Sequence, residues 1–380
     1  MSLLDPHMLL HLIVRGFDLA TMVIVVGGFA FESFVAAPAF DRLSGPSQKT
    51  ATLAFRRRYT RLIGWSLAAL LIIQGIDLVF RVQMMSGRPV SAVLGLIPQA
   101  AVETHVGKVW LAKMAVLVGL LIIWLFVLGT GTPAPPRTTR HRRALLAGAA
   151  LFCLLVALAG HAADRGNVSL DVAADWLHVM AVSAWVGGLI SLRALLPAAL
   201  DRLDEKTAAR VFTDALGRFS TVAGVCLAIL LSTGVYHVLI HIHTWDGLSS
   251  PYGLALLVKL AFVAPMIALG ALGRYAILPE LRALTGERVR LRGFARLANA
   301  SIASVRRMIN RHSSTLAEAG ERTAVERRGL RLILFECLLA AGVLACTAIL
   351  TQTMPPHVTG FHAPGAMPHD MSDMPGTPIR

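Results

Sequence analysis

Eight long apolar segments constrain this chain more than any other feature of its sequence. They lie near residues 11–35, 60–82, 106–130, 143–163, 173–198, 218–241, 251–273 and 330–352. Each is long enough for an α-helix to cross the hydrocarbon core of a bilayer, which takes about 20 residues. Charged residues make up only 15% of the 380 positions, fewer than in an ordinary soluble domain. We therefore predict an all-α integral membrane protein with eight transmembrane helices.

The basic residues fall mainly in alternate connectors. Connectors 41–61, 131–143, 200–218 and 274–331 together hold 27 Lys and Arg, whereas the termini and the connectors of the opposite side hold 5. Cytoplasmic loops carry the excess of Lys and Arg, so both termini are predicted to be extracytoplasmic. The net charge of +14 then reflects topology, and the expected partner is the lipid bilayer and not nucleic acid.

The two halves of the chain repeat a pattern at an offset of 160 residues. The letters V-G-G at 26–28 and D-R-L at 41–43 recur at 186–188 and 201–203. Four helices per repeat is an even number, so the halves have the same orientation. We predict two tandem parallel four-helix repeats, at 1–165 and 166–353. The second contains a cytoplasmic amphipathic insertion at about 280–325, and a disordered His- and Met-rich tail follows at 354–380.

Ionisable side chains inside the predicted spans form one layer below the outer boundary. They are Arg15, Asp18, Asp77, Lys113, His178, His237 and Lys259. Such groups are costly in a bilayer, and most that persist face a bundle interior or a pathway. The repeat matches Asp18 with His178, Asp77 with His237 and Lys113 with Lys259. A simpler interpretation is mutual neutralisation, of Arg15 by Asp18 and of the lysines by the aspartates.

Histidines concentrate on the predicted outer face. Of the 13 histidines, 11 lie at or near that face, and several methionines accompany them. Imidazole binds Cu, Zn, Fe and Ni, whereas thioether sulfur selects Cu(I), so the combination favours copper. The candidate ligands are His161, His178, His237, Met180, His241, His243, His357, His362, Met367, His369, Met371 and Met374. The pair His241 and His243 and the tail residues would collect metal, and the first three histidines would receive it.

No Ser-His-Asp set, phosphate-binding loop or pair of catalytic carboxylates is present, so no enzymatic activity is expected. The four cysteines fall inside apolar segments and are interpreted as small buried residues. The sequence leaves the oligomeric state open, including a homo-oligomer.

Several of these segments resemble the copper resistance protein D (CopD) family. The residues are G-H-A at 160–162, D-W-L-H-x6-W-V-G-G at 175–188, R-F-S at 218–220, S-T-G at 232–234, P-Y-G-x5-K-L at 251–260, G-x-x-x-R at 270–274 and L-T-Q-T at 350–353. The resemblance implies a bacterial inner-membrane protein that moves copper from periplasm to cytoplasm beside a small periplasmic copper-binding partner. It carries over to His161 and His178 only.

Three functions are compatible with these observations. The first is a copper importer that contributes to copper homeostasis and resistance. The second is a b-type haem-binding electron-transfer subunit, because paired histidines on neighbouring helices hold such haem. The third is a copper-binding sensor or assembly protein that transports nothing.

Overall fold

The computed structural model describes residues 6–129, 139–160, 168–241, 250–285 and 318–351. Every regular element within these ranges is helical. Eight helical segments in these ranges are long and apolar enough to cross a membrane. The prediction of an all-α chain with eight membrane-spanning helices is confirmed.

The long helices are α1 (Pro6–Phe31), α3 (Gly45–Ser86), α6 (His105–Gly129), α7 (Thr139–Leu158), α8 (Leu170–Leu200), α9 (Glu205–His241), α10 (Pro251–Leu272) and α13 (Glu318–Leu350). Helix α1 continues through the π-helical turn η1 (Glu32–Ala36) into α2 (Ala37–Phe40), and α10 continues through η5 (Gly273–Ile277) into α11 (Leu278–Leu284). Between α3 and α6 lie α4 (Val90–Val93), η2 (Leu94–Leu96) and α5 (Ile97–Glu103), which the sequence analysis left as a plain connector.

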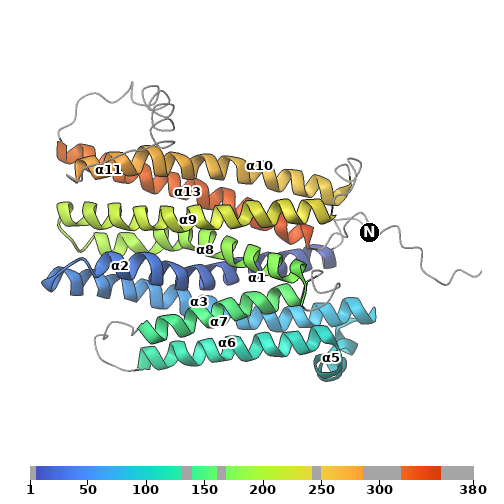
Figure 1. Cartoon of the computed structure of the whole chain (residues 1–380). Coiled ribbons are helices and arrows are strands. Elements are labelled where there is room, and N and C mark those ends of the chain that lie inside the picture. The colour runs from blue at the N-terminus through green and yellow to red at the C-terminus, as the bar shows by residue number, and fades with distance from the viewer. Residues whose placement is uncertain (1–5, 130–138, 161–167, 242–249, 286–317, 352–380) are drawn as a thin grey trace, which may run out of the picture.

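The long helices run side by side, with α1 and α8 in the middle of the bundle (Figure 1). Helices α6 and α7 lie toward one edge, and α10 and α13 lie at the other. Helix α1 packs along α8 and also contacts α3, α7 and α13, whereas α8 contacts α3, α7, α9 and α13. The first four spans and the last four therefore meet through these two central helices.

Two glycines set the distance between α1 and α8. A Cβ atom added at Gly187 would lie 2.8 Å from the Gly27 Cα and would collide with the carbonyl oxygen of Val23. A Cβ added at Gly27 would collide with Gly187 and with the carbonyl oxygen of Ser183. Small residues allow helix backbones in membranes to approach closely. The contact is reciprocal. Each glycine faces the glycine of the other helix and also the carbonyl group four residues before that partner glycine.

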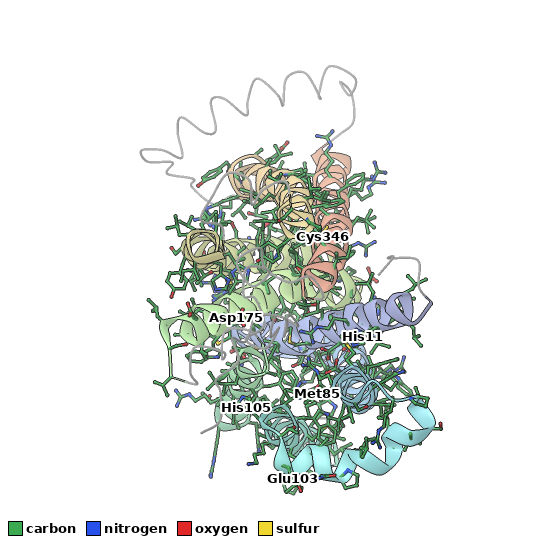
Figure 2. The ribbon with its side chains drawn as sticks, turned by 90° about the vertical axis from the view of Figure 1, so that its right-hand side faces the viewer. His11, Met85, Glu103, His105, Asp175 and Cys346 are labelled. Carbon is green, nitrogen blue, oxygen red and sulfur yellow. The ribbon has the colours of Figure 1, made fainter. Side chains whose placement is uncertain are left out.

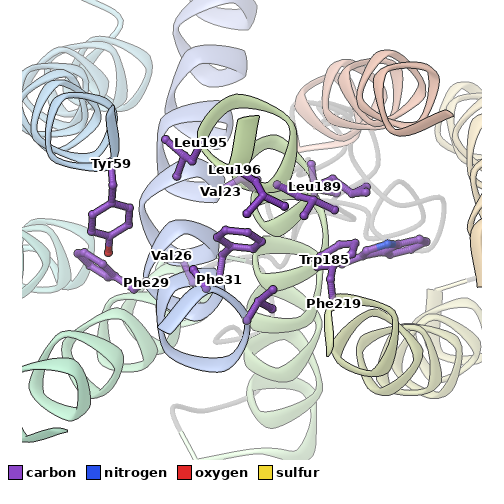
Figure 3. Packing of buried hydrophobic residues seen from close by; sticks show 14 of the residues in the cluster. Val23, Val26, Phe29, Phe31, Tyr59, Trp185, Leu189, Leu195, Leu196 and Phe219 are labelled. Atoms are coloured by element: carbon purple, nitrogen blue, oxygen red, sulfur yellow. The ribbon is translucent and has the colours of Figure 1, made fainter. Parts of the chain in front are cut away.

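Large side chains fill the space around this crossing. Val23 and Val26 of α1 and Leu189 and Trp185 of α8 belong to one buried cluster, in which Trp185 lies beside Phe219 (Figure 3). Phe219 of α9 packs directly against Gly188 of α8. A Cβ added at Gly188 would lie 2.7 Å from the Phe219 ring. Glycine on α8 thus lets neighbouring helices approach on two faces.

Each π-helical turn precedes a proline. In η1 the Ala37 N–H donates to the Glu32 carbonyl, and in η5 the Leu278 N–H donates to the Gly273 carbonyl. Pro38 and Pro279 follow directly in α2 and α11. Proline has no N–H and its ring clashes with the carbonyl four residues earlier, so one extra residue per turn at this point allows the helix to continue.

Candidate metal centre

Two imidazoles from neighbouring helices lie together in the second half. His178 comes from α8 and His237 from α9, with ring centroids 5.6 Å apart and an angle of 24° between the ring planes. Both side chains are partly buried. His178 lies eight residues into α8, about 12 Å along the helix at 1.5 Å per residue. The pair therefore lies below the end of the bundle at which α8 begins and not at that end itself.

Thr233 of α9 lies within hydrogen-bonding distance of the His178 ring. The Thr233 hydroxyl donates to the carbonyl of Ile229 at 2.8 Å, and its oxygen lies 2.8 Å from His178 Nδ1. A hydroxyl has one hydrogen, so while that hydrogen is donated to Ile229, Thr233 accepts a hydrogen bond from His178 Nδ1–H in the matching tautomer. The neutral ring then carries its lone pair on Nε2, the arrangement that a metal-binding histidine adopts when a second residue orients it.

A carboxylate lies on the same side of α8 as His178. Asp175 precedes His178 by three residues, a spacing that places two side chains on one face of a helix. A Cβ added at Gly160, at the end of α7, would lie 3.9 Å from Asp175 Oδ2. Asp175 is also within electrostatic range of Lys259 on α10 and of Arg15 on α1. The carboxylate thus lies close to the end of the fourth span, on the face of α8 that also carries His178.

A hydrogen bond joins the start of α8 to the last turns of α9 near this pair. The Tyr236 hydroxyl donates to Asp171 Oδ1 at 2.7 Å, and the Tyr236 ring lies 6.0 Å from the His237 ring. Ser169 caps the start of α8 by accepting from the Val172 N–H. These contacts hold the two helices that carry the imidazoles in a fixed relation.

In the first half of the chain, the charged side chains at the matching positions are paired and hydrogen-bonded. Arg15 pairs with Asp18 at 2.7 Å, and Gln74 Nε2 donates to Asp18 Oδ1 at 2.6 Å. Lys113 Nζ donates to Gln74 Oε1 at 2.7 Å. Asp18, Gln74 and Lys113 are buried, and a buried charge is tolerated when it is paired and hydrogen-bonded.

Asp77 belongs to the same level but has a different partner. Arg81, one turn later on α3, donates to Asp77 Oδ2 at 2.7 Å. The ion pair expected between Arg15 and Asp18 is present, as described above. Lys113, however, reaches Asp18 through the amide of Gln74, although both aspartates lie within its electrostatic range. An uncharged amide satisfies both charged groups at once because it donates and accepts.

Of the remaining candidate ligands, the structure describes some and leaves others outside its described ranges. Met180 packs against the central core and lies two residues from His178, a spacing that turns two side chains away from each other. His241 ends α9. The following residues lie outside the described part of the chain: His161, His243, His357, His362, Met367, His369, Met371 and Met374. Most of the insertion expected at about 280–325 and the tail at 354–380 also lie outside it.

Among the described residues, no group of three His, Cys, Asp or Glu is close enough to hold a metal ion. Near the end of the bundle at which α8 begins, the described side chains discussed here that could ligate a metal are therefore the two imidazoles, with the Asp175 carboxylate nearby.

Sequence reasoning missed several polar residues that contact the predicted ones. Gln74 is a polar residue inside an apolar span and Thr233 lies in the S-T-G segment, but neither ionises, so neither entered a search for charged groups. Asp175 could have been found, because the 160-residue offset matches it with Arg15. These two residues carry opposite charges and lie within electrostatic range of each other.

Toward the opposite end of the bundle, the described residues also include buried polar side chains. Tyr59 donates to Glu32 Oε2 at 3.0 Å, and both residues are buried. Glu336 on α13 is buried near Gly270 of α10. The four cysteines are free thiols, of which Cys153, Cys226 and Cys346 are buried and Cys337 is partly buried, in agreement with their interpretation as small interior residues.

Comparison with known proteins gives matches along most of the chain. A family profile described as copper resistance protein D-like, N-terminal domain matches residues 4–171, and one described as copper resistance protein D matches residues 213–306. Of the motifs quoted above, only G-H-A at 160–162 lies within the first match. No solved structure matches the chain.

Curated relatives come from three bacteria. Copper resistance protein D of Pseudomonas syringae pv. tomato is 29% identical over 72% of this chain and 83% of the relative. Copper transport protein CutJ of Bacillus subtilis is 29% identical over 47% of this chain and 32% of the relative. Inner membrane protein YebZ of Escherichia coli is 25% identical over 48% of this chain and 59% of the relative. This multi-pass membrane chain belongs to the copper resistance protein D family.

Proposed function

We propose that this protein imports copper across the bacterial inner membrane, from the periplasm to the cytoplasm. The observation that carries the proposal is the His178 and His237 pair, with ring centroids 5.6 Å apart. Thr233 directs the lone pair of His178 to Nε2, so the pair can accept a soft cation. The names of two relatives, a copper resistance protein and a copper transport protein, support copper as the cargo.

The proposed orientation places both termini and the histidine pair on the periplasmic side. The distribution of Lys and Arg supports it. Histidines of the 354–380 tail and of the connector after α9 would collect copper there, together with a small periplasmic copper-binding protein. His161 would complete a three-imidazole site with the pair.

The proposed transport step is a rocking of two four-helix repeats against each other. The reciprocal approach of Gly27 and Gly187, which are 160 residues apart, supports a pseudo-twofold axis along the membrane normal. Glu32 with Tyr59, Glu336 and the thiol of Cys226 are interior polar groups toward the other end of the bundle, and copper would leave past them.

Uptake of isotopic copper, supplied as Cu(I), into proteoliposomes tests the proposal. We expect time-dependent uptake by the wild type and none by the His178→Ala, His237→Ala double variant. His105→Ala is the matched control, because His105 is an exposed outer-face histidine that contacts the Leu158 carbonyl and should leave uptake unchanged. Equal uptake by wild type and double variant contradicts the proposal, and copper binding without uptake favours a sensor or assembly protein.

A haem-binding subunit is the second candidate, because two imidazoles on neighbouring helices are also a haem ligand set. The visible absorption spectrum of purified protein separates the two functions. A Soret band near one haem per chain, lost in the same double variant, would replace copper import with electron transfer.

A further inference from the structure

One buried carboxyl group differs from the others in its contacts. The buried carboxyl side chains of the described residues are Asp18, Glu32, Asp77 and Glu336. Asp18 and Asp77 each pair with an arginine at 2.7 Å, and Glu32 accepts a hydrogen bond from Tyr59 at 3.0 Å. Glu336 has an exposed fraction of 4%, and within the described ranges no ion pair or hydrogen bond involves it.

Glu336 lies on the face of α13 that packs against the rest of the protein. The buried side chains of this helix recur at helical spacing and include Val325, Ile333, Glu336, Ala340, Val343 and Cys346. Figure 2 is a view along the bundle and shows α13, where Cys346 is labelled, beside α10. Helix α13 also contacts α1 and α8. The carboxyl group of Glu336 therefore faces neighbouring helices and not lipid.

Glycine on α10 makes room for this carboxyl group. A Cβ atom added at Gly270 would lie 3.9 Å from Glu336 Oε1. A Cβ added at Gly273 would lie 3.3 Å from Leu332 Cδ2, so the two helices are also close one turn later. Gly273 begins the π-helical turn η5, and π-helical turns are frequent at functional sites. The carboxyl group thus lies beside the place where α10 changes its helical form.

The ionisable side chains around Glu336 come from α13 and from the elements packed against it. Those within about two turns of its level are Arg331 and Cys337 on α13, Arg193 on α8, Cys226 on α9, Arg274 and Tyr275 on η5, and Glu32 after α1. Arg274 donates to the Ser220 carbonyl at 2.7 Å, and Arg193 and Arg331 are exposed. Among the described residues, none of these groups pairs with Glu336.

Burial without a partner determines the protonation of this carboxyl group. An ionised carboxylate that is buried and unpaired is so costly that the group takes up a proton instead. Ionisable residues within membrane spans mark ion pathways and proton relays. Glu336 therefore holds a proton while α10 and α13 are packed together, and it releases the proton only when water or a cation reaches it.

We propose that Glu336 is the proton-binding site that couples proton entry to copper import. The coupling rests on the proposed function, because import supplies the motion that exposes the carboxyl group. His178 lies about 12 Å into α8, whereas Gly270, beside Glu336, lies about 28 Å into α10 from the same end of the bundle. The copper and proton sites are therefore separate. Both can be occupied at once, which favours co-transport of one proton with each copper ion over exchange at a shared site.

Labelling with dicyclohexylcarbodiimide tests the proton site. This apolar reagent modifies protonated carboxyl groups in apolar surroundings, and peptide mass spectrometry locates the modified residue. At neutral pH we expect modification of Glu336 in the full-length protein in detergent. Asp18 and Asp77 are internal controls that should stay unmodified, because they are buried but paired with arginine. The exposed Glu205 should also stay unmodified, since exposed carboxyl groups are ionised at neutral pH.

Copper accumulation in proteoliposomes tests the coupling. With Cu(I) supplied, the membrane potential clamped and the outside about one pH unit more acidic than the lumen, one proton per copper should raise the accumulation ratio up to about tenfold. Glu336→Gln should lose this response because an amide releases no proton, whereas Glu336→Asp keeps a titratable carboxyl group and should retain it. Glu205→Gln is the matched control and should respond as the wild type does. Equal acidification of both sides should produce no accumulation.

Failure of this inference can be told apart from failure of the proposed function. A wild type that takes up copper without responding to the gradient overturns the coupling, while import stands. Unmodified Glu336, a response that survives Glu336→Gln, or a response that Glu336→Asp does not restore overturns the proton site. Absence of copper uptake by the wild type under every gradient overturns the proposed function and the coupling with it, even if Glu336 is modified.

Discussion

Substitution of Gly187 by alanine tests how closely α1 and α8 must approach. The added Cβ would lie 2.8 Å from the Gly27 Cα, about 0.6 Å closer than the shortest ordinary contact of 3.4 Å. The obstacle is backbone on both sides, so no rotamer change relieves it and the helices must separate. Overpacking of this kind costs about 1–3 kcal/mol. We expect the upper part of that range, because separation also loosens core residues such as Val23 and Leu189.

Thermal unfolding in detergent, followed with a thiol-reactive fluorescent dye, measures this cost because three of the four free cysteines are buried. Gly119→Ala is the matched control, since a Cβ there would meet nothing within 4 Å and alanine favours helix by up to about 1 kcal/mol. We expect Gly187→Ala to lower the unfolding midpoint by several degrees and the control to leave it unchanged or higher. A midpoint for Gly187→Ala equal to that of the control would refute the reasoning.

Three further predictions follow from the polar contacts and the topology. Thr233→Val should weaken binding of Ag⁺, a redox-inert monovalent probe, about 10–100-fold because His178 loses the hydroxyl that orients it, and Thr233→Ser should restore it; an unchanged affinity contradicts the assigned role. Gln74→Leu should cost about 3 kcal/mol in thermal unfolding, since a buried carboxylate and a buried ammonium lose their shared amide; an unchanged midpoint would mean that water replaces the bridge. In intact cells, a membrane-impermeant maleimide should label Ser91→Cys but not Ser47→Cys, both exposed positions, and the reverse pattern would invert the proposed orientation.

The membrane-spanning architecture was predictable because it depends on local properties of the sequence. About 20 consecutive apolar residues leave a chain few alternatives to a transmembrane helix. The eight predicted segments therefore correspond to eight helices, even though α3 extends well beyond its predicted span. The short helices between Val90 and Glu103 were not predicted, because short apolar stretches separated by proline carry a weak helical signal.

The candidate site was predictable only in part. His178 and His237 are conspicuous because ionisable groups in apolar segments are rare. Their partners are not conspicuous: Thr233 and Gln74 are uncharged and appear unremarkable in a sequence. Which side chain accepts, donates or bridges depends on how neighbouring helices are rotated about their axes.

The sequence by itself determined the number of apolar helices long enough to cross a membrane, whereas the outer position of the polar layer and the matching of the two halves stay predictions. These properties follow from hydropathy and spacing along one chain. Only the tertiary structure decided that Gln74 bridges Lys113 to Asp18 and that the rings of His178 and His237 lie together. The physical reason is that charge pairing inside a membrane depends on distances of a few ångströms between helices, and packing at residues such as Gly27 and Gly187 sets those distances.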